Sequence, residues 1–155
     1  MVRVRTPFNL DTFLGNVDTG IMVRSLPKQQ ALFSQGDTTE TVFYIQAGKV
    51  KLTVVSEQGK EAVIAILERG AFVGESCLAG QTVRTMTATT LDDSKLVRLD
   101  KPVMLRLLQE QPRFAEAFMS YLLTHSIRIQ EDLVDQLFNS SEKRLARALL
   151  LLAHF

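Results

Sequence analysis

The sequence has a single cysteine, Cys77, and therefore cannot form an internal disulfide. No apolar run at the N-terminus resembles a signal peptide, and no apolar stretch approaches the roughly 20 residues that span a bilayer. Neither charge dominates, since 18 basic and 17 acidic side chains leave a formal net charge of +1. These absences exclude a disulfide-rich scaffold, a transmembrane protein and a broadly basic nucleic-acid surface. We expect a cytoplasmic protein with no membrane partner.

Histidine is also scarce, with 2 in the whole sequence and none before residue 125. A metal-dependent enzyme built on a β-barrel needs several histidine and carboxylate ligands that converge inside the barrel. One cysteine cannot hold an iron-sulfur cluster either. We expect no metal site, no required cofactor and no catalytic residues.

The 155 residues, 46% of them hydrophobic, are enough for one domain with a substantial core. Up to residue 100, short segments rich in β-branched residues are separated by glycine-containing turns, which predicts a small antiparallel barrel or jelly roll. Residues 49–54 alternate polar and apolar, and a turn at 56–60 predicts a hairpin with 61–67. Residues 85–90 and 94–99 predict a second strand pair that turns at 91–93.

After Asp100 the pattern becomes helical, so the predicted class is mainly β with C-terminal helices. Pro102 suits the first turn of a short amphipathic helix, which Pro112 ends or bends. A longer helix is predicted over 112–138. Asn139-Ser-Ser-Glu142 then has the pattern of a helix stop followed by a new helix start.

Two apolar stripes run along the longer helix at about 100° per residue. A surface helix needs one stripe, so the second predicts burial against another surface, most simply the same helix of a second copy. The alternative is a helix buried within one larger domain. The stripe expected at a homodimer interface is Phe118, Leu122, Ile129, Leu133 and Leu137, and the adjacent stripe is Leu123, Ile127, Val134 and Phe138.

The most informative motif is a Gly-Glu pair, Gly74 and Glu75, that stands nine positions before an Arg-Thr pair, Arg84 and Thr85. Glycine lets the backbone approach a ligand closely, and a carboxylate accepts hydrogen bonds from sugar hydroxyls. An arginine fork binds a phosphate with two parallel donors. The motif therefore predicts a nucleotide-phosphate pocket, against the simpler reading of an ion pair that supports a loop.

Phe72-Val-Gly-Glu75 followed by Arg84-Thr85 resembles the phosphate-binding cassette of cyclic-nucleotide-binding domains, in which Phe-x-Gly-Glu precedes Arg-Ser/Thr-Ala. The ranges 40–50 and 59–67 look like the strands that precede this cassette in bacterial regulators of the Crp-Fnr family. The resemblance covers nearly the whole chain. It implies a double-stranded β-helix, the jelly-roll barrel of cyclic-nucleotide-binding domains, followed by a long dimerisation helix.

The resemblance also implies a role for each cassette residue. Glu75 would accept a hydrogen bond from the ribose 2'-hydroxyl, while Arg84 would pair with the cyclic phosphate. The backbone amides of Glu75 and Ser76 and the hydroxyl of Thr85 would complete the phosphate site. Contacts with the base would come from Leu52, Ala65 and Leu67.

Two positions depart from the cyclic-AMP binders of this family. Met86 stands where alanine is usual, and its larger side chain crowds the phosphate loop. The hydroxyl pair that contacts adenine from the long helix aligns with Ile129 and Gln130, of which only Gln130 can donate or accept a hydrogen bond. The candidate effectors are therefore cyclic AMP (cAMP) or cyclic GMP (cGMP), beside a cyclic dinucleotide or an empty, vestigial pocket.

The expected organisation has three parts. Residues 1–100 form the effector-binding jelly roll, residues 101–138 the short helix and the dimerisation helix, and residues 139–155 a hinge and the start of a DNA-binding domain. We expect DNA contacts only through a C-terminal helix-turn-helix domain absent from these residues. The alternative is a structural dimerisation module without a ligand; a kinase or channel module fits the cassette but not the hinge-like residues 139–147.

Overall fold

The computed structural model describes residues 8–15 and 20–153 of the 155-residue chain. The chain divides into two compact units, Met1–Ala115 and Glu116–Phe155. The first unit contains all the described strands and is built as two four-stranded antiparallel sheets, in the orders β1-β8-β3-β6 and β2-β7-β4-β5.

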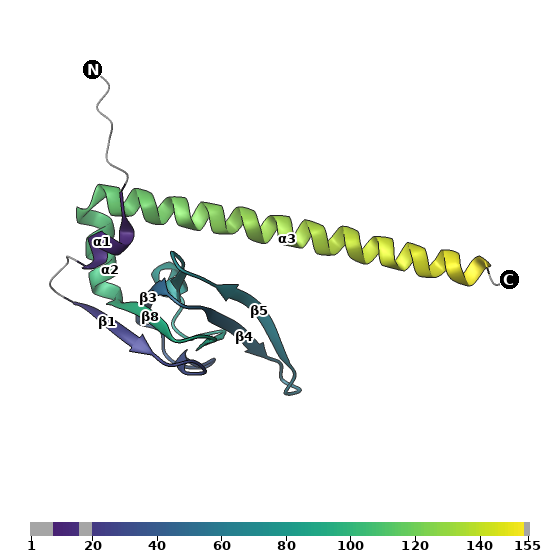
Figure 1. Cartoon of the computed structure of the whole chain (residues 1–155), viewed down its shortest axis with the longest axis horizontal. Coiled ribbons are helices and arrows are strands. Elements are labelled where there is room, and N and C mark those ends of the chain that lie inside the picture. The colour runs from purple at the N-terminus through teal and green to yellow at the C-terminus, as the bar shows by residue number, and fades with distance from the viewer. Residues whose placement is uncertain (1–7, 16–19, 154–155) are drawn as a thin grey trace, which may run out of the picture. The chain divides into compact units, whose positions relative to one another are not determined.

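Figure 1 labels the main elements along the chain. The strands are β1 (Ile21–Leu26), β2 (Ala31–Phe33), β3 (Thr41–Ala47), β4 (Val50–Val55), β5 (Glu61–Leu67), β6 (Phe72–Val73), β7 (Thr87–Thr90) and β8 (Ser94–Asp100). The helices are α1 (Leu10–Gly15), the short 3-10 helix η1 (Glu75–Ala79), α2 (Lys101–Glu110) and α3 (Pro112–Ala153). The predicted class, a jelly roll with C-terminal helices, is confirmed.

The predicted hairpin of β4 and β5 is present. Its strands pair from Val50 opposite Leu67 to Val55 opposite Glu61. Gly59, in the turn, has φ +82°, which a residue with a side chain rarely adopts. Local alternation and turn chemistry were therefore sufficient to predict this hairpin.

The predicted pairing between the strands on either side of 91–93 is wrong. Strand β7 pairs with β2 and β4, whereas β8 pairs with β1 and β3, so the two strands belong to different sheets. The connection crosses between the sheets, and the amide of Leu91 donates to the carbonyl of Lys49 at 2.8 Å. A turn signal marks where a strand ends but not which sheet the next strand joins.

A hydrophobic core fills the space between the two sheets. Alternate residues of β3 and β8 point into it, as expected for the two-residue period of a strand. The fully or nearly fully buried members of this core are Phe43, Ile45, Val50, Leu67, Val73, Ala88 and Leu96.

The other face of the first sheet is covered by helices. The rings of Phe72, Phe13 and Phe114 connect β6, α1 and the first turn of α3, with centroids of Phe13 and Phe114 5.4 Å apart. Helix α2 packs on β3 and β8 and buries Met104 and Leu107, while Pro102 lies in its first turn as predicted. Strand β3 is thus buried on both faces, which fixes the position of its first residue, Thr41, beside the candidate site.

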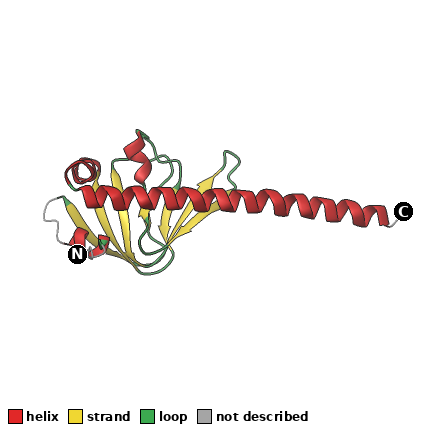
Figure 2. Ribbon diagram, turned by 90° about the horizontal axis from the view of Figure 1, so that it is seen from above, coloured by secondary structure: helices red, strands yellow, loops and turns green. Residues whose placement is uncertain are grey.

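The helix break predicted at 139–142 is wrong. Helix α3 continues from Pro112 to Ala153, as the uninterrupted ribbon in Figure 2 shows. The polar side chains that suggested a cap bond backwards within the helix instead. Asn139 donates to the Asp135 carboxylate at 3.1 Å, and the hydroxyl of Ser141 donates to the carbonyl of Leu137 at 2.9 Å. Since no glycine or proline follows Pro112, nothing in the sequence forces the helix to end.

Candidate functional site

The cassette contains the short 3-10 helix η1 with a glycine at each end. Gly74 precedes η1 with φ +81° and Gly80 follows it with φ +91°, so glycines allow the sharp turn at each end. A β-carbon added to Gly74 would lie 2.5 Å from Nη1 of Arg84. Gly74 is therefore needed both for its backbone angle and for the close approach of the arginine.

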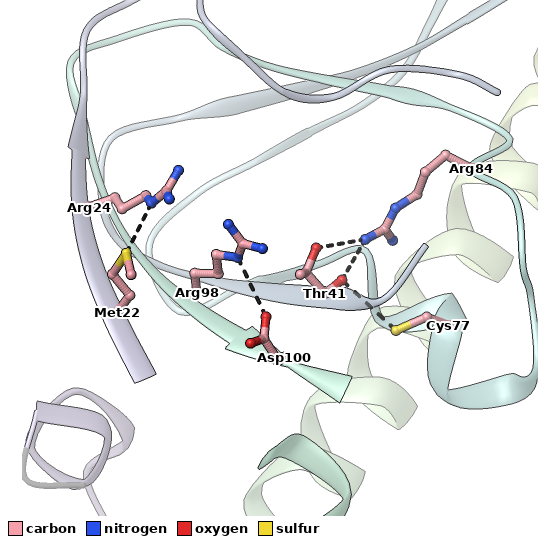
Figure 3. Close-up of polar contacts among 7 residues, drawn as sticks. All are labelled: Met22, Arg24, Thr41, Cys77, Arg84, Arg98 and Asp100. Carbon is pink, nitrogen blue, oxygen red and sulfur yellow. Dashed lines mark hydrogen bonds and ion pairs between the residues drawn. The ribbon is translucent and has the colours of Figure 1, made fainter. Parts of the chain in front are cut away.

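Arg84 is held by the backbone around it. Its Nη1 donates to the carbonyl oxygen of Gly74 at 2.8 Å, and its Nη2 donates to the carbonyl oxygen and the hydroxyl of Thr41 at 2.5 and 3.2 Å. Figure 3 shows the guanidinium directed at Thr41. In the other direction, the backbone amide and carbonyl of Arg84 bond Asp37 and Gly36. The arginine is thus fixed at both its side chain and its main chain.

The guanidinium of Arg84 is a buried charge. Only 3% of the residue is exposed, and the group lies over the ring of Phe33 with Cζ 4.0 Å from the ring centroid. Burial lowers the pKa of Arg84, while the nearby Cys77, Glu75 and Asp37 act in the opposite direction. Its Nε is buried and has no hydrogen-bond partner in the part of the chain that the structure describes. Because the hydrogen bonds of the Arg84 guanidinium go to neutral oxygens, its positive charge can still pair with an anion.

The predicted cassette residues converge on one cavity of about 100 Å³. We call this space the cassette cavity. Its lining includes the predicted residues Leu52, Gly74, Glu75, Ser76, Arg84, Thr85 and Met86. The hydroxyl of Ser76 donates to Gln81, whose Nε2 lies 3.5 Å from the Thr85 hydroxyl, so a polar chain crosses the wall of the cavity.

Other predicted contacts lie elsewhere. Ala65 and Leu67 are on β5 and pack with the core between the sheets rather than lining the cassette cavity. Ile129 and Gln130 are exposed residues of α3 in the second unit, and their part in the site stays a prediction.

Three residues at the site were not predicted: Phe33, Thr41 and Gln81. Phe33 had a weak signal, since it is an aromatic residue in a short apolar segment. Thr41 acts largely through its carbonyl oxygen, which every residue carries, so no side-chain pattern could have identified it. Gln81 lies inside the cassette loop, where a polar residue is the ordinary choice for an exposed turn.

Within residues 8–15 and 20–153, no three histidine, cysteine, aspartate or glutamate side chains are placed to share an ion. No helix in those same ranges has both the length and the apolarity needed to cross a membrane.

A jelly roll with a glycine-flanked 3-10 helix and a buried arginine beside one small cavity has the architecture of the cyclic-nucleotide-binding class of β-barrel domains. Comparison with known families identifies the family. Residues 23–111 match the cyclic nucleotide-binding domain, and the chain belongs to this family. The resemblance to Crp-Fnr regulators is confirmed by relatives that are named as global transcriptional regulators.

Three similarities carry this statement. A CRP-like cAMP-activated global transcriptional regulator of Mycobacterium tuberculosis is 26% identical over 127 residues, which are 82% of this chain and 57% of the relative. The cyclic AMP receptor protein of Thermus thermophilus is 30% identical over 128 residues, 82% of this chain and 59% of the relative. The crystal structure of the Thermus thermophilus catabolite activator protein superimposes with a TM-score of 0.66 at 26% identity, over 83% of this chain and 58% of that one. The chain therefore spans less than two thirds of these relatives.

Proposed function

We propose that this chain is the effector-binding and dimerising part of a Crp-Fnr-type transcription regulator in the cytoplasm, and that the cassette cavity binds a cyclic nucleotide. The observation that carries the proposal is the convergence of Gly74, Glu75, Ser76, Arg84 and Thr85 on one cavity. These residues come from the two ends of a loop, and each supplies a group that a sugar phosphate requires.

The cyclic phosphate binds Arg84. The guanidinium is desolvated, and its three hydrogen bonds go to neutral oxygens of Gly74 and Thr41. A phosphate oxygen gives a charge-assisted hydrogen bond, roughly twice as strong as one to a neutral acceptor. The Thr85 hydroxyl and the amides of Glu75 and Ser76 add further donors, and the Glu75 carboxylate accepts from a ribose hydroxyl.

The cassette cavity must widen to admit a whole nucleotide. Its volume of about 100 Å³ is below the roughly 300 Å³ at which small-molecule sites begin. Met86 lines the cavity and is larger than the alanine expected there. Binding therefore moves Met86 and turns Arg84 from its backbone acceptors toward the phosphate. In this way the bound ligand changes the conformation of the cassette loop. The two relatives described above are named for cyclic AMP, and cAMP and cGMP are the effectors that we propose to test first.

The long helix supplies the dimer interface. Ile129 and Leu133 are 55% and 54% exposed, and among the described residues from Met119 to Leu152 the leucine, isoleucine, valine, methionine and phenylalanine side chains are also exposed within one chain. A helix with so much exposed apolar surface is stabilised by packing against a partner, and parallel packing of two copies places the ligand-binding domains symmetrically. Of the predicted interface residues, Leu122, Ile129, Leu133 and Leu137 are exposed within one chain, whereas Phe118 is already buried, with 6% of the residue exposed.

In this proposal residues 1–100 bind the effector, residues 101–138 form the dimer, and residues 139–155 lead toward a DNA-binding domain. Ligand binding shifts the population of conformations of the cassette and, through the long helices, the setting of the DNA-binding domains. The chain makes and breaks no bond in this scheme and is not an enzyme. A dimerisation module that binds no ligand is the competing function.

Calorimetric titration of the full chain with cAMP, cGMP and cyclic di-GMP tests the proposal. We expect saturable binding of at least one ligand, weakened in Arg84→Ala by about 2 to 5 kcal/mol because a buried charge pair loses one partner. Lys60→Gln, which removes an exposed charge from the β4–β5 turn, should bind like the wild type. Circular dichroism establishes that Arg84→Ala is folded. A folded wild type that binds none of the three ligands would establish the competing function.

A further inference from the structure

A second cavity, of about 330 Å³, also has Arg84 in its lining. We call it the arginine cavity, because Arg24 of β1, Arg98 of β8 and Arg84 all line it. Phe33 and Arg84, stacked on each other, line both cavities. In the view of Figure 3, Arg24 and Arg84 extend toward each other from opposite sides, and Arg98 lies between them.

Two of these arginines lie on the inner faces of their strands, where Arg24 is exposed and Arg98 is half-buried. Side chains two residues apart on a strand point to the same face. Arg98 therefore shares the inner face of β8 with the fully buried Leu96, and Arg24 shares the inner face of β1 with Leu26, which packs against the core. The inner faces of two adjacent strands thus change from leucine to arginine toward one end of the sheet.

Arg24 and Arg98 are also close neighbours across the sheet. Arg24 lies opposite Leu96, and Met22 lies opposite Arg98, so the two arginines are diagonal partners. Diagonal side chains on one face are separated by about 7 to 8 Å, within reach of each other for groups of this length. Their two positive charges therefore lie near each other on the same face of the sheet.

The local partners neutralise this charge only in part. Nε of Arg24 contacts the sulfur of Met22 at 3.4 Å, which is a weak acceptor, and Nε of Arg98 lies 3.6 Å from the Asp100 carboxylate. Asp37 and Glu40 also line the cavity, but Asp37 accepts the amide of Ser34 at 2.9 Å. The lining therefore contains three guanidinium groups and two carboxylates.

Protection of a sheet edge does not explain the pair. Inward-pointing charges on edge strands prevent unwanted strand pairing, and β1 is an edge strand. Strand β8, however, lies between β1 and β3, where there is no edge to protect. Arg98 thus calls for another explanation, and a concave site suits a small ligand better than a flat surface does.

We propose that the arginine cavity is a second ligand site, which binds a small organic dianion with carboxylate or phosphate groups. The forked guanidinium groups of Arg24 and Arg98 match the oxygens of either acid. The volume is in the range of small-molecule sites. This site is distinct from the cassette cavity, and its existence does not depend on cyclic-nucleotide binding.

Because Arg84 lines both cavities, the two sites are coupled. A dianion in the arginine cavity competes for the guanidinium that the cassette would use for phosphate, so each ligand weakens the binding of the other. Such coupling is reciprocal by thermodynamic necessity. This part of the inference rests on the proposed function.

Titration of the full chain at low ionic strength with succinate and with inorganic phosphate tests the second site. Succinamide, which has the shape of succinate without its charge, is the ligand control. We expect saturable binding of at least one dianion, about tenfold or more weaker in Arg24→Gln and in Arg98→Gln, because each change removes a charge-assisted contact. Glu40→Gln should tighten binding, since it removes a carboxylate from the lining, and the exposed-charge control Lys60→Gln should change nothing.

The outcomes separate this proposal from the proposed function. No binding of either dianion to the folded wild type overturns it, as does unchanged binding in the folded double variant with Arg24→Gln and Arg98→Gln. An equal loss in Lys60→Gln also overturns it, because the effect would then reflect net charge alone. If a dianion binds and no cyclic nucleotide does, the second site is supported and the proposed function fails. If both bind, a succinate-dependent loss of nucleotide affinity supports the coupling, and its absence overturns the coupling alone.

Discussion

Nη1 of Arg84 donates to the carbonyl oxygen of Gly74 at 2.8 Å, so the cation and the glycine of the cassette bind each other. The two residues are ten positions apart and enclose η1 between them. This hydrogen bond joins the two ends of the loop and orients the Arg84 side chain along the cavity wall. Anything that opens the bond changes both the loop and the position of the charge.

Gly74→Ala should destabilise the protein more than the loss of glycine alone explains. The left-handed backbone costs a residue with a β-carbon about 1 to 2 kcal/mol. At Gly74 the new carbon also lies 2.5 Å from Nη1 of Arg84, and such overpacking adds about 1 to 3 kcal/mol. Urea denaturation gives the free energy of unfolding.

Gly80→Ala is the matched control for this prediction. Gly80 ends the same 3-10 helix with φ +91°, but an added β-carbon meets no atom within 4 Å. The loss in the free energy of unfolding of Gly80→Ala should therefore reflect only the cost of the left-handed backbone. Equal losses of stability in the two variants would mean that crowding of Arg84 by the new β-carbon adds nothing to the cost, contrary to the prediction.

Met86→Ala should increase the affinity for a cyclic nucleotide. The change enlarges the cassette cavity at a half-buried position and relieves crowding of about 1 kcal/mol, which corresponds to about fivefold in the dissociation constant. Calorimetry with the ligand that binds the wild type measures the effect. Val83→Ala shortens an exposed side chain of the same loop outside the cavity lining and should leave affinity unchanged. Weaker binding in Met86→Ala would show that this side chain contacts the ligand instead of obstructing it.

The parts of this structure that could be predicted from sequence are those decided by neighbouring residues. The hairpin of β4 and β5 follows from strand alternation and a glycine turn, and α2 follows from its apolar spacing and Pro102. The pairing of β7 and β8 was wrong because a strand's partner is chosen by the packing of two whole sheets. The break near Asn139 was wrong because the same side chain can cap a new helix or bond back to Asp135, and the sequence allows both.

The candidate site likewise contains some residues that could be predicted from the sequence and others that could not. Glu75 and Arg84 were found because a ligand's chemistry requires particular side chains at a particular spacing. The acceptor on Thr41 was not, because it is a backbone carbonyl brought to Arg84 from 43 positions away. The arginine cavity was also invisible in the sequence, since Arg24 and Arg98 become neighbours only through the register of β1 and β8.

Leu133→Glu should convert a dimer into a monomer. Leu133 is 54% exposed in one chain and belongs to the predicted interface stripe. Burial of an unpaired carboxylate there costs several kcal/mol, so the dimer dissociation constant should rise at least about a hundredfold. Light scattering over a concentration series measures the change. Thr124→Glu adds the same charge to the exposed opposite face of α3, about 180° away, and should leave the assembly intact. A wild type that is monomeric at the highest concentration would contradict the prediction.

Stability should fall at alkaline pH through Tyr44. Burial raises the pKa of the Tyr44 phenol, and the neighbouring Asp11 carboxylate raises it further, whereas Arg69 lowers it slightly. The unfolded chain loses this proton near the ordinary pKa of about 10, but the folded chain retains it to higher pH. Above that value the unfolded state binds fewer protons, so the free energy of unfolding decreases by up to about 1.4 kcal/mol per pH unit.

Denaturation at about pH 9 and pH 11 measures this loss of stability, and Tyr44→Phe should make it smaller because the titrating phenol is gone. Asp11→Asn tests the second cause. It removes the carboxylate that bonds Arg69 at 2.8 Å, so it should lower stability at both pH values but reduce the additional alkaline loss. If wild type and Tyr44→Phe lose the same stability between the two pH values, the phenol ionises as readily in the folded chain as in the unfolded one, contrary to its burial between β3 and the helices.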